Sequence, residues 1–396
     1  MRLAVRPDGA GPVTTAEGWA HRMRFDLSSD QEFFRETTSK FLAASVPVAE
    51  LRRRRDDPSG HDEAYWRQGC ELGWTSLLVD EAHGGGSISG DGLSDLVLVA
   101  HEFGAHAAPG PLVPCAVAAG ALASHGGEQH AATVEGLVSG EVTAAWCDAG
   151  AAGTTTSPSL TTDGDELVLT GTLRPVEAAA GADVLLVTAD HADGTSQVLV
   201  PADAAGVTVT PLTTIDLTRR FATVAFDGVR VAPSDLVGPA GAAADAVAAQ
   251  RRQALALVLH ESVGAMQVGF EMTVEWAFDR YSFGRPLASY QELKHRFADM
   301  KAWLEASHAV ADAAVAAIAE GDPEADDLLS AGKAYVGQYG GELLQDCVQI
   351  HGGIGVTFEH DLHIYLRRFT VDRATHGTPA DHRQRLTDLI EMRKVA

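Results

Sequence analysis

The sequence predicts an α+β protein of several domains, in which a helical region is followed by a β-domain and then by a helical bundle. Three observations predict this. The 396 residues exceed the roughly 250–300 that one hydrophobic core accommodates. Hydrophobic spacing is helical at both ends of the chain and alternates in the middle. The last helical segments are too long for ordinary surface helices and suit a bundle of antiparallel helices. We therefore expect a polar extension over 1–24, a helical domain over 25–140, a β-domain over 141–238 and a helical bundle over 239–396.

The elements follow in that order. Ser29 and Glu32 have the spacing of a capping box and predict where the first helix begins. Apolar residues at helical spacing predict further helices over 66–78, 92–103 and 113–124. Short β-rich runs predict strands over 166–170, 183–188, 196–200, 207–210 and 222–226, arranged as an antiparallel barrel or sandwich. Asp227-Gly228 predicts a hairpin turn after the last of these runs. Long helices are expected over 243–280, 289–320 and 326–351.

Composition and charge exclude several classes of protein. The chain has 30 basic and 54 acidic residues, a formal net charge of −24, which argues against nucleic acid and anionic membrane surfaces as partners. No run approaches the roughly 18 apolar residues of a membrane span. The first residues have no signal-peptide pattern, so a cytoplasmic location is expected. The four cysteines are scattered and predict neither a metal site nor a disulfide framework.

Two motifs point to a ligand. The first is Arg280-Tyr-Ser-Phe-Gly-Arg-Pro-Leu287, and the second is Gln349-Ile-His-Gly-Gly-Ile-Gly-Val-Thr357. The planar fork of Arg280 suits a phosphate, and Phe283 offers a flat apolar face beside it. Gly352 and Gly353 allow backbone N–H groups to approach a ligand closely. Either motif alone is also typical of an ordinary helix end or turn.

Together, in this order and on this background, the motifs resemble the acyl-CoA dehydrogenase family of flavoproteins. The resemblance implies an N-terminal helical domain, a middle β-barrel and a C-terminal four-helix bundle. It also implies FAD as cofactor, α,β-desaturation of an acyl-CoA thioester and an electron-transfer flavoprotein as acceptor. In that family a neighbouring subunit holds the ADP half of FAD. Carried onto this chain, the cofactor-binding residues are Arg280, Ser282, Phe283, Gln291, Gln349, Gly352, Gly353 and Thr378.

The sequence departs from the family where the reaction takes place. The family removes the α-proton of the substrate with a glutamate. His376 stands at the usual position of that glutamate, and Ala254 stands at the position that a minority of members use. Glu261 lies on the same predicted helix as Ala254, about 10 Å further along its axis. Each expected carboxylate is therefore missing, and His376 or Glu261 would have to serve as an unusual base.

The side that should hold the flavin ring also departs from the family. Arg174-Pro175-Val176-Glu177 replaces a segment with an aromatic residue and a hydroxyl that supports the ring. Proline lacks the backbone donor, and Glu177 would disfavour a reduced, anionic ring.

The sequence lacks the residues that would serve the chain's own FAD and its reaction, but it keeps the residues that serve a neighbour's FAD. This pattern resembles the non-catalytic subunit of actinobacterial heteromeric acyl-CoA dehydrogenases, so we expect a second acyl-CoA dehydrogenase subunit as partner in a heterotetramer. One alternative is a self-sufficient homotetramer that uses Glu261 or His376 as its base. Another is a relative adapted to other flavin chemistry or to acyl-CoA binding.

Overall fold

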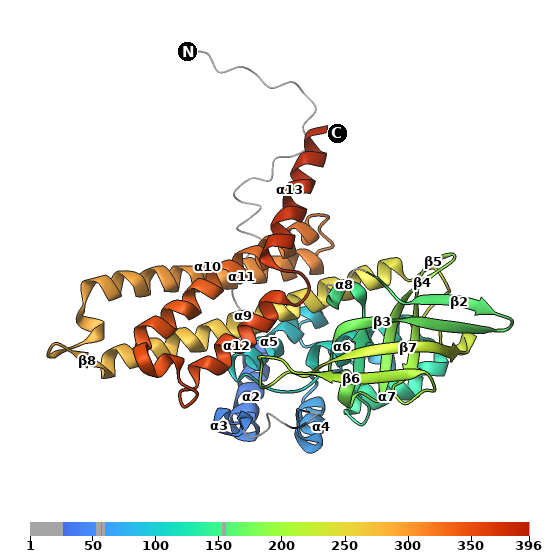
Figure 1. Ribbon diagram of the computed structural model, residues 1–396, viewed down its shortest axis with the longest axis horizontal. Helices are drawn as coiled ribbons and strands as arrows, with labels where there is room; N and C mark the ends of the chain where they lie inside the picture. Colours follow the sequence, from blue (N-terminus) through green and yellow to red (C-terminus); the bar gives the residue numbers. More distant parts are fainter. Residues whose placement is uncertain (1–26, 53–56, 58–59, 153–155, 396) are drawn as a thin grey trace, which may run out of the picture.

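A computed structural model describes residues 27–52, 57, 60–152 and 156–395 of the chain. Along the sequence, helices precede and follow the strands of a β-sheet, as predicted (Figure 1). The sheet occupies one end of the molecule and the long helices occupy the other. The predicted polar extension over 1–24 lies outside the described residues.

The N-cap of the first helix lies one residue earlier than predicted. Ser28 is the N-cap of α2, and its hydroxyl accepts the backbone N–H of Gln31 at 3.2 Å. The Gln31 side chain in turn accepts the Ser28 N–H at 3.1 Å. The prediction of Ser29 and Glu32 was therefore wrong, because Ser28 is the residue with an extended backbone and Gln31 completes the pair. The helices of this region are α2 (Ser29–Ser45), α3 (Val48–Leu51), α4 (Glu63–Glu71), α5 (Gly92–Ala105), α6 (Leu112–His125) and α7 (Ala131–Ser139).

The middle region is a curled seven-stranded sheet. Its strands are β1 (Ala144–Cys147), β2 (Ser159–Asp163), β3 (Glu166–Glu177), β4 (Val184–His191), β5 (Gly194–Pro201), β6 (Val207–Leu212) and β7 (Phe221–Val231). The strand order is β1-β4-β2-β3-β7-β6, and β5 pairs with β4 outside this order. Most neighbouring strands are antiparallel, but β2 meets β4 in parallel at Ser159 and Asp190, and β1 pairs with β4 in parallel along its length. The sequence did not indicate this pairing, because the β2–β3 hairpin separates β1 from β4 along the chain.

The predicted turn at Asp227-Gly228 was wrong. Both residues lie inside β7, where the pairing with β3 shifts register between Leu169 and Gly171. Gly228 has φ +63° and the Asp227 N–H donates to Gly206 O at 2.9 Å. The Asp-Gly pair therefore forms a β-bulge instead of a hairpin turn. Both structures suit a residue with positive φ.

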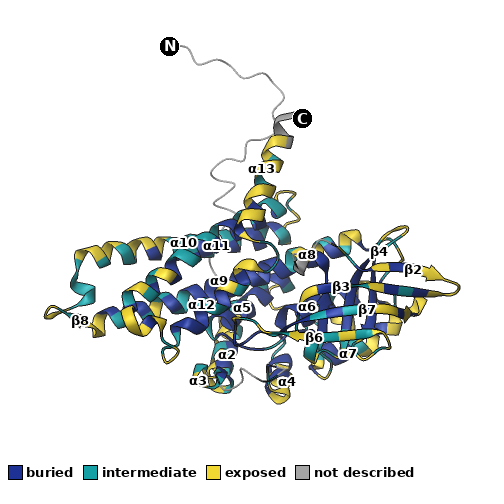
Figure 2. Cartoon of the chain, in the orientation of Figure 1, coloured by how far each residue is buried: buried dark blue, intermediate teal, exposed yellow. Residues whose placement is uncertain are grey.

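The C-terminal region is a helical bundle. Its elements are α9 (Ala244–Asp279), the short β8–β9 hairpin (Tyr281–Ser282 and Arg285–Pro286), α10 (Gln291–Ala319), α11 (Ala325–His351), α12 (Leu362–Ala374) and α13 (Pro379–Val395). Helices α9 to α12 pack together, whereas α13 packs on α11 and projects from the bundle (Figure 1). The middle of α9 is buried, and exposed residues gather on the outer faces and at the bundle tip (Figure 2).

Two glycines allow α9 to lie close against α5. A Cβ atom at Gly104 would lie 1.9 Å from the backbone oxygen of Glu261, and one at Gly264 would lie 2.1 Å from that of His101. Any side chain at either position would separate the two helices. This close crossing places the buried middle of α9 directly against the N-terminal helices.

Candidate active site and cofactor site

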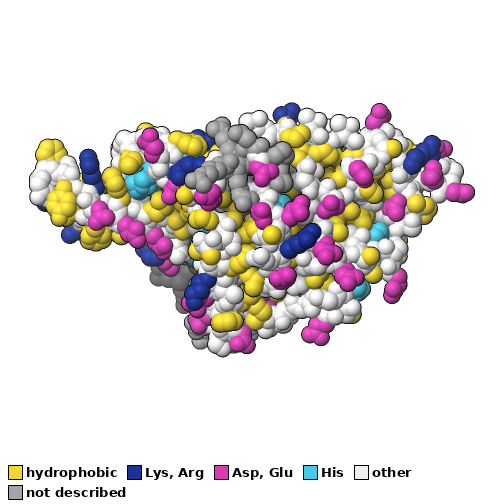
Figure 3. All heavy atoms as spheres, turned by 90° about the horizontal axis from the view of Figure 1, so that it is seen from below, with side chains coloured by type: hydrophobic (Ala, Val, Ile, Leu, Met, Phe, Trp, Pro, Cys, Tyr) yellow, Lys and Arg dark blue, Asp and Glu magenta, His cyan; other side chains and the backbone are white. Residues whose placement is uncertain are grey.

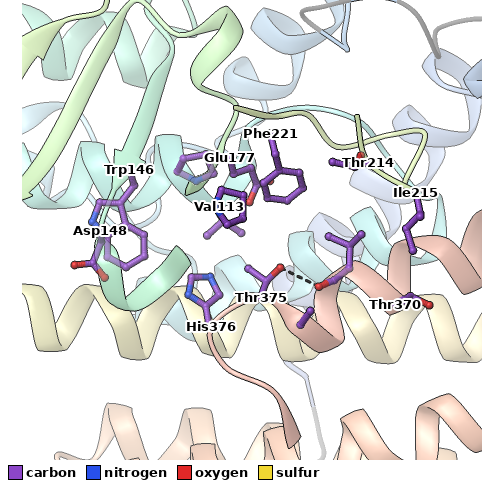
Figure 4. Close-up of a pocket in the computed structure, with 14 residues that line it drawn as sticks. Val113, Trp146, Asp148, Glu177, Thr214, Ile215, Phe221, Thr370, Thr375 and His376 are labelled. Atoms are coloured by element: carbon purple, nitrogen blue, oxygen red, sulfur yellow. Dashed lines mark hydrogen bonds between the residues drawn. The ribbon is translucent and has the colours of Figure 1, made fainter. Parts of the chain in front are cut away.

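A cavity of about 350 Å³ lies between the sheet, the start of α6 and the end of α12 (Figure 4). Most of its wall is apolar, and polar groups come from two carboxylates, three threonines and one histidine. Side chains from the sheet face side chains from the α12 end across the space. The lining residues are Val113, Pro114, Trp146, Asp148, Pro175, Glu177, Thr214, Ile215, Phe221, Thr370, Val371, Ala374, Thr375 and His376.

His376 lies in the cavity wall, just after α12, with φ +58°. Its ring lies 6.0 Å from the Trp146 ring at an interplanar angle of 30°. Burial, reinforced by the nearby positive charge of Lys333, lowers the pKa of His376 to about 3. The imidazole is therefore neutral at physiological pH, and its lone pair is a weak base.

The two carboxylates in the wall are already paired. Asp148 accepts two hydrogen bonds from Arg251, each 2.8 Å long. Glu177 lies 3.3 Å from Arg219, and burial raises the pKa of Glu177. Neither is a free ionised carboxylate that faces the cavity.

Behind the cavity lies a buried ionic cluster, which we define as Glu177, Asp216, Arg219, Glu261, Lys333, Arg368 and Asp372. Arg219 pairs with Glu261 and, at 3.0 Å, with Asp372. Arg368 pairs with Glu261, lies 3.6 Å from Asp216 and donates to the Ala108 backbone oxygen at 3.0 Å. With four acids and three bases the cluster holds one surplus negative charge if all are ionised. Burial and the nearby Glu261 raise the pKa of Asp372, which reduces this surplus.

The ionic cluster bears directly on the expected bases. Glu261 is 1% exposed, and its two carboxylate oxygens bond to Arg219 and Arg368. It does not line the cavity. Both carboxylate oxygens of Glu261 are thus bonded to guanidinium groups, an arrangement that does not favour the expected role of Glu261 as a base. Ala254 is completely buried on the same helix and has no titratable group.

Lys333 ties the His376 segment to the bundle. It is 2% exposed, and its Nζ donates to the backbone oxygens of Asp372 and, at 2.7 Å, Thr375. Burial lowers the pKa of Lys333. The amine thus fixes the carbonyls at the end of α12, immediately before His376. Sequence reasoning missed this residue and most of the ionic cluster.

The Arg280 motif forms an exposed hairpin at the far end of the bundle from the sheet (Figure 1). Phe283 is 97% exposed and has φ +49°, and Gly284 follows with φ +80°. The Tyr290 hydroxyl donates to Ser282 O at 2.7 Å and holds the hairpin to the start of α10. An aromatic residue held in the left-handed region and in water is typical of a contact site rather than of a core.

The glycine motif lies at the same end of the bundle. Gly352 ends α11 with φ +68°, and a Cβ atom at Gly355 would lie 2.7 Å from Val348 O. Gly353 has neither constraint, since a Cβ atom there would meet nothing within 4 Å. The Trp276 and His351 rings stack with centroids 5.3 Å apart and join the two motifs.

Of the remaining predicted cofactor residues, two lie at the hairpin end and one lies next to the cavity, just after His376. Gln291 and Gln349 are exposed at the hairpin end, at the start of α10 and near the end of α11. Thr378 lies just after His376, and its hydroxyl donates to Asp381 at 2.7 Å in the first turn of α13. Figure 3 shows hydrophobic side chains gathered at the hairpin end of the molecule.

Comparison with known proteins places the chain in a family. The profile of the acyl-CoA dehydrogenase N-terminal domain matches residues 28–141, and that of the C-terminal domain matches residues 242–389. The acyl-CoA dehydrogenase IpdE2 of Mycolicibacterium smegmatis is 29% identical over 91% of this chain and 98% of its own length. The acyl-CoA dehydrogenase FadE27 of Mycobacterium tuberculosis is 30% identical over 77% of this chain and 82% of its own length.

Solved structures agree with this assignment. A single-residue variant of the Tcur3481–Tcur3483 steroid ACAD superposes with a TM-score of 0.82 at 27% identity, covering 92% of this chain and 99% of that one. A chain of the ChsE4–ChsE5 complex from Mycobacterium tuberculosis has the same fold, with a TM-score of 0.83 at 24% identity over 93% and 99% of the two chains.

The chain belongs to the acyl-CoA dehydrogenase family. It is thus a member of a family of oxidoreductases that act on acyl-CoA and generally bind FAD. The fold class expected from the sequence is confirmed. In the part of the chain that the structure describes, no helix is long and apolar enough to span a membrane.

Proposed function

We propose that this chain is the FAD-completing subunit of a heteromeric acyl-CoA dehydrogenase and does not itself abstract the substrate proton. The observation that carries the proposal is that the hairpin end and the cavity at the sheet, which lie apart in the chain, differ in what they can bind. Residues suited to the ADP half of FAD are exposed and grouped at one end of the bundle. The chain's own cavity, at the sheet, lacks an available carboxylate base.

The residues at the hairpin end fit the ADP half of FAD. Among the described residues, the Arg280 guanidinium has no carboxylate partner, so its N–H groups are free for a phosphate. Phe283 offers an exposed ring, and the open space around Gly353 leaves its backbone accessible. When bound in the assembly, FAD would supply the hydride-accepting chemistry, and these residues would only hold and orient it. Ser282, Gln291, Gln349 and Gly352 are assigned to the same end.

The cavity does not fit the flavin ring half. Pro175 provides no N–H, Glu177 and Asp148 place carboxylates in the wall, and the Trp146 and His376 rings lie in the wall close to each other. Thr378, which the family resemblance assigns to FAD, is engaged in capping α13. The chain is therefore proposed to support a partner's FAD rather than one of its own.

Two observations speak against a self-sufficient homotetramer. The carboxylate of Glu261 is bonded to Arg219 and Arg368, so it is not available as a base. His376 has a pKa of about 3, far below the operating pH at which a general base is effective.

The proposal extends to substrate, acceptor and location. The similarity of this chain to the steroid ACAD supports an acyl-CoA with a steroid-type acyl group as the substrate of the assembly. The two-part name Tcur3481–Tcur3483 supports a second acyl-CoA dehydrogenase subunit as partner. An electron-transfer flavoprotein is the proposed acceptor, and the cytoplasm is the proposed location.

The test uses the complex of this chain with its partner, obtained by co-expression. Arg280→Ala should weaken FAD retention about ten- to a hundredfold, because a charge-assisted hydrogen bond contributes about 1.5–3 kcal/mol. Arg280→Lys should recover part of the loss, since an ammonium cannot form the planar fork. His376→Ala should leave FAD content and turnover nearly unchanged. Flavin absorbance per protein after gel filtration and steady-state rates are the measurements. Full FAD in Arg280→Ala together with an inactive His376→Ala complex would make this chain the catalytic subunit.

A further inference from the structure

We propose that Trp276 is a positioning residue for Arg280, and that the rings of His351, which stacks on Trp276, and His360, which lies edge-on to it, hold Trp276 in place. This inference rests on the proposed function, because it concerns how the chain presents Arg280 to the phosphates of FAD. No motif in the sequence marks Trp276 for this role.

Trp276 lies one helical turn before Arg280, at the end of α9. The Arg280 backbone N–H donates to Trp276 O at 2.8 Å and closes the last turn of the helix. The guanidinium carbon lies 5.9 Å from the centroid of the indole ring, within the range of a cation–π contact. Among the described residues this ring is the sole side-chain partner of Arg280.

Two histidines from another part of the chain fix the indole. The His351 ring stacks on it at 5.3 Å with an interplanar angle of 18°. The His360 ring lies edge-on to both, 6.4 Å from Trp276 and 4.5 Å from His351. The three rings therefore form one packed unit that joins the end of α9 to the glycine motif.

Backbone hydrogen bonds hold the orientation of each imidazole. His351 is 4% exposed, and its Nδ1 lies 2.8 Å from Cys347 O, so Nδ1 carries the proton. Burial, together with His360, lowers the pKa of His351, which keeps this ring neutral. His360 Nδ1 accepts the Leu362 N–H at 3.2 Å. A neutral His351 adds no positive charge that would repel the neighbouring guanidinium.

A supported indole reduces the freedom that Arg280 must lose when it binds. An unrestrained arginine samples many rotamers, and ordering them opposes binding. A ring that already restricts the guanidinium lowers this cost and raises affinity without touching the ligand. Trp276 is therefore expected to act through Arg280 alone.

The test measures the FAD dissociation constant of the flavin-free complex of this chain with its partner. Trp276→Leu should weaken FAD binding about three- to tenfold, and Trp276→Phe should recover much of the loss because it keeps an aromatic face. Trp303→Leu is the matched control. Trp303 is a partly buried tryptophan on α10 with an arginine, Arg296, 5.0 Å from its ring, and it lies outside both motifs. This control should leave FAD binding unchanged.

A double-mutant cycle distinguishes positioning from a general structural effect. If Trp276 acts through Arg280, Trp276→Leu should add no further loss in the Arg280→Ala background. An equal loss in both backgrounds, or a loss in Trp303→Leu of the same size, would overturn the inference. If Arg280→Ala itself has no effect on FAD, the proposed function fails instead. If Arg280→Ala weakens binding and Trp276→Leu does not, the positioning role alone is wrong.

Discussion

Glu261 and Arg368 form an ion pair in which each side chain is 1% exposed. Glu261 comes from α9 and Arg368 from α12, and Arg368 also bonds to Ala108 O in the N-terminal region. Through Arg219 the same pair reaches the loop that precedes β7. The ionic cluster therefore contacts all three regions of the chain, and several expected outcomes follow from it and from the cavity beside it.

Glu261→Ala should destabilise the protein strongly. The substitution breaks the buried ion pairs of Glu261 with Arg219 and Arg368, and breaking a buried pair by removing one partner typically costs about 3–5 kcal/mol of unfolding free energy. The measurement is chemical denaturation followed by circular dichroism. Glu271→Ala, at an exposed position on the same helix, is the control and should change stability little. A Glu261→Ala protein as stable as the control would mean that the cluster does not hold the regions together.

Stability should fall as the pH falls from about 6.5 towards 4. Burial, reinforced by His101, lowers the pKa of His308 to about 4, and the two rings lie 5.6 Å apart. Between these pH values the unfolded chain binds a proton that the folded chain does not, so the group destabilises the folded state as acid is added. His376, with a pKa of about 3, acts in the same direction.

Each such histidine contributes about 1.4 kcal/mol per pH unit in this window. The unfolding free energy measured at pH 6 and pH 5 should therefore depend less on pH in His308→Gln than in the parent protein. An unchanged slope in His308→Gln would show that His308 titrates normally in the folded chain.

The isolated chain should bind FAD poorly and should not dehydrogenate any acyl-CoA at a rate normal for the family. A missing general base typically lowers the rate about 10²–10⁴-fold. The purified chain should therefore be colourless, and a dye-reduction assay with steroid-type and medium-chain acyl-CoA should give no turnover above background. A yellow isolated chain that dehydrogenates an acyl-CoA at a rate normal for the family would refute this prediction.

His376→Glu alone should not create an active enzyme. The substitution returns a carboxylate to the family position, but Pro175 still lacks an N–H and the Glu177 carboxylate remains in the wall. The flavin ring would therefore remain unsupported. The assay is flavin content and turnover of the isolated variant, with His376→Gln as the uncharged control. If His376→Glu were coloured and active, the cavity would hold a flavin ring after all.

The sequence predicted the long helices well because their signal is local. Apolar periodicity predicted α9 over 243–280 and α11 over 326–351, within a residue of their observed bounds. By contrast, two local sequence signals gave wrong predictions. Ser28 and Ser29 both fit a helix start, and Asp227-Gly228 suits a bulge as well as a hairpin. In such cases tertiary contacts choose between local alternatives.

The ionic cluster could not be predicted, because its members are far apart in the sequence. Arg219 lies within a short loop segment, Asp216-Leu-Thr-Arg-Arg220, and the high density of charged residues in this loop between two strands was the sole local signal. Glu261 and Lys333 interrupt otherwise apolar helix faces, which indicates burial only when their partners are known. The motifs at the hairpin end could be read from the sequence and carried the family resemblance, and comparison with the family marked His376 and Arg174-Pro175-Val176-Glu177 as departures.

The exposed hairpin has a consequence for the amount of this protein in a cell. Phe283 is 97% exposed and Tyr281 is 63% exposed, next to the free guanidinium of Arg280. Large apolar side chains in water are what chaperones bind and what leads unassembled chains to aggregation or proteolysis. Under the proposed function, a copy bound to its partner covers this surface, whereas an unassembled copy exposes it to water. On that proposal, degradation of unassembled copies would match the amount of this chain to that of its partner without any dedicated regulator.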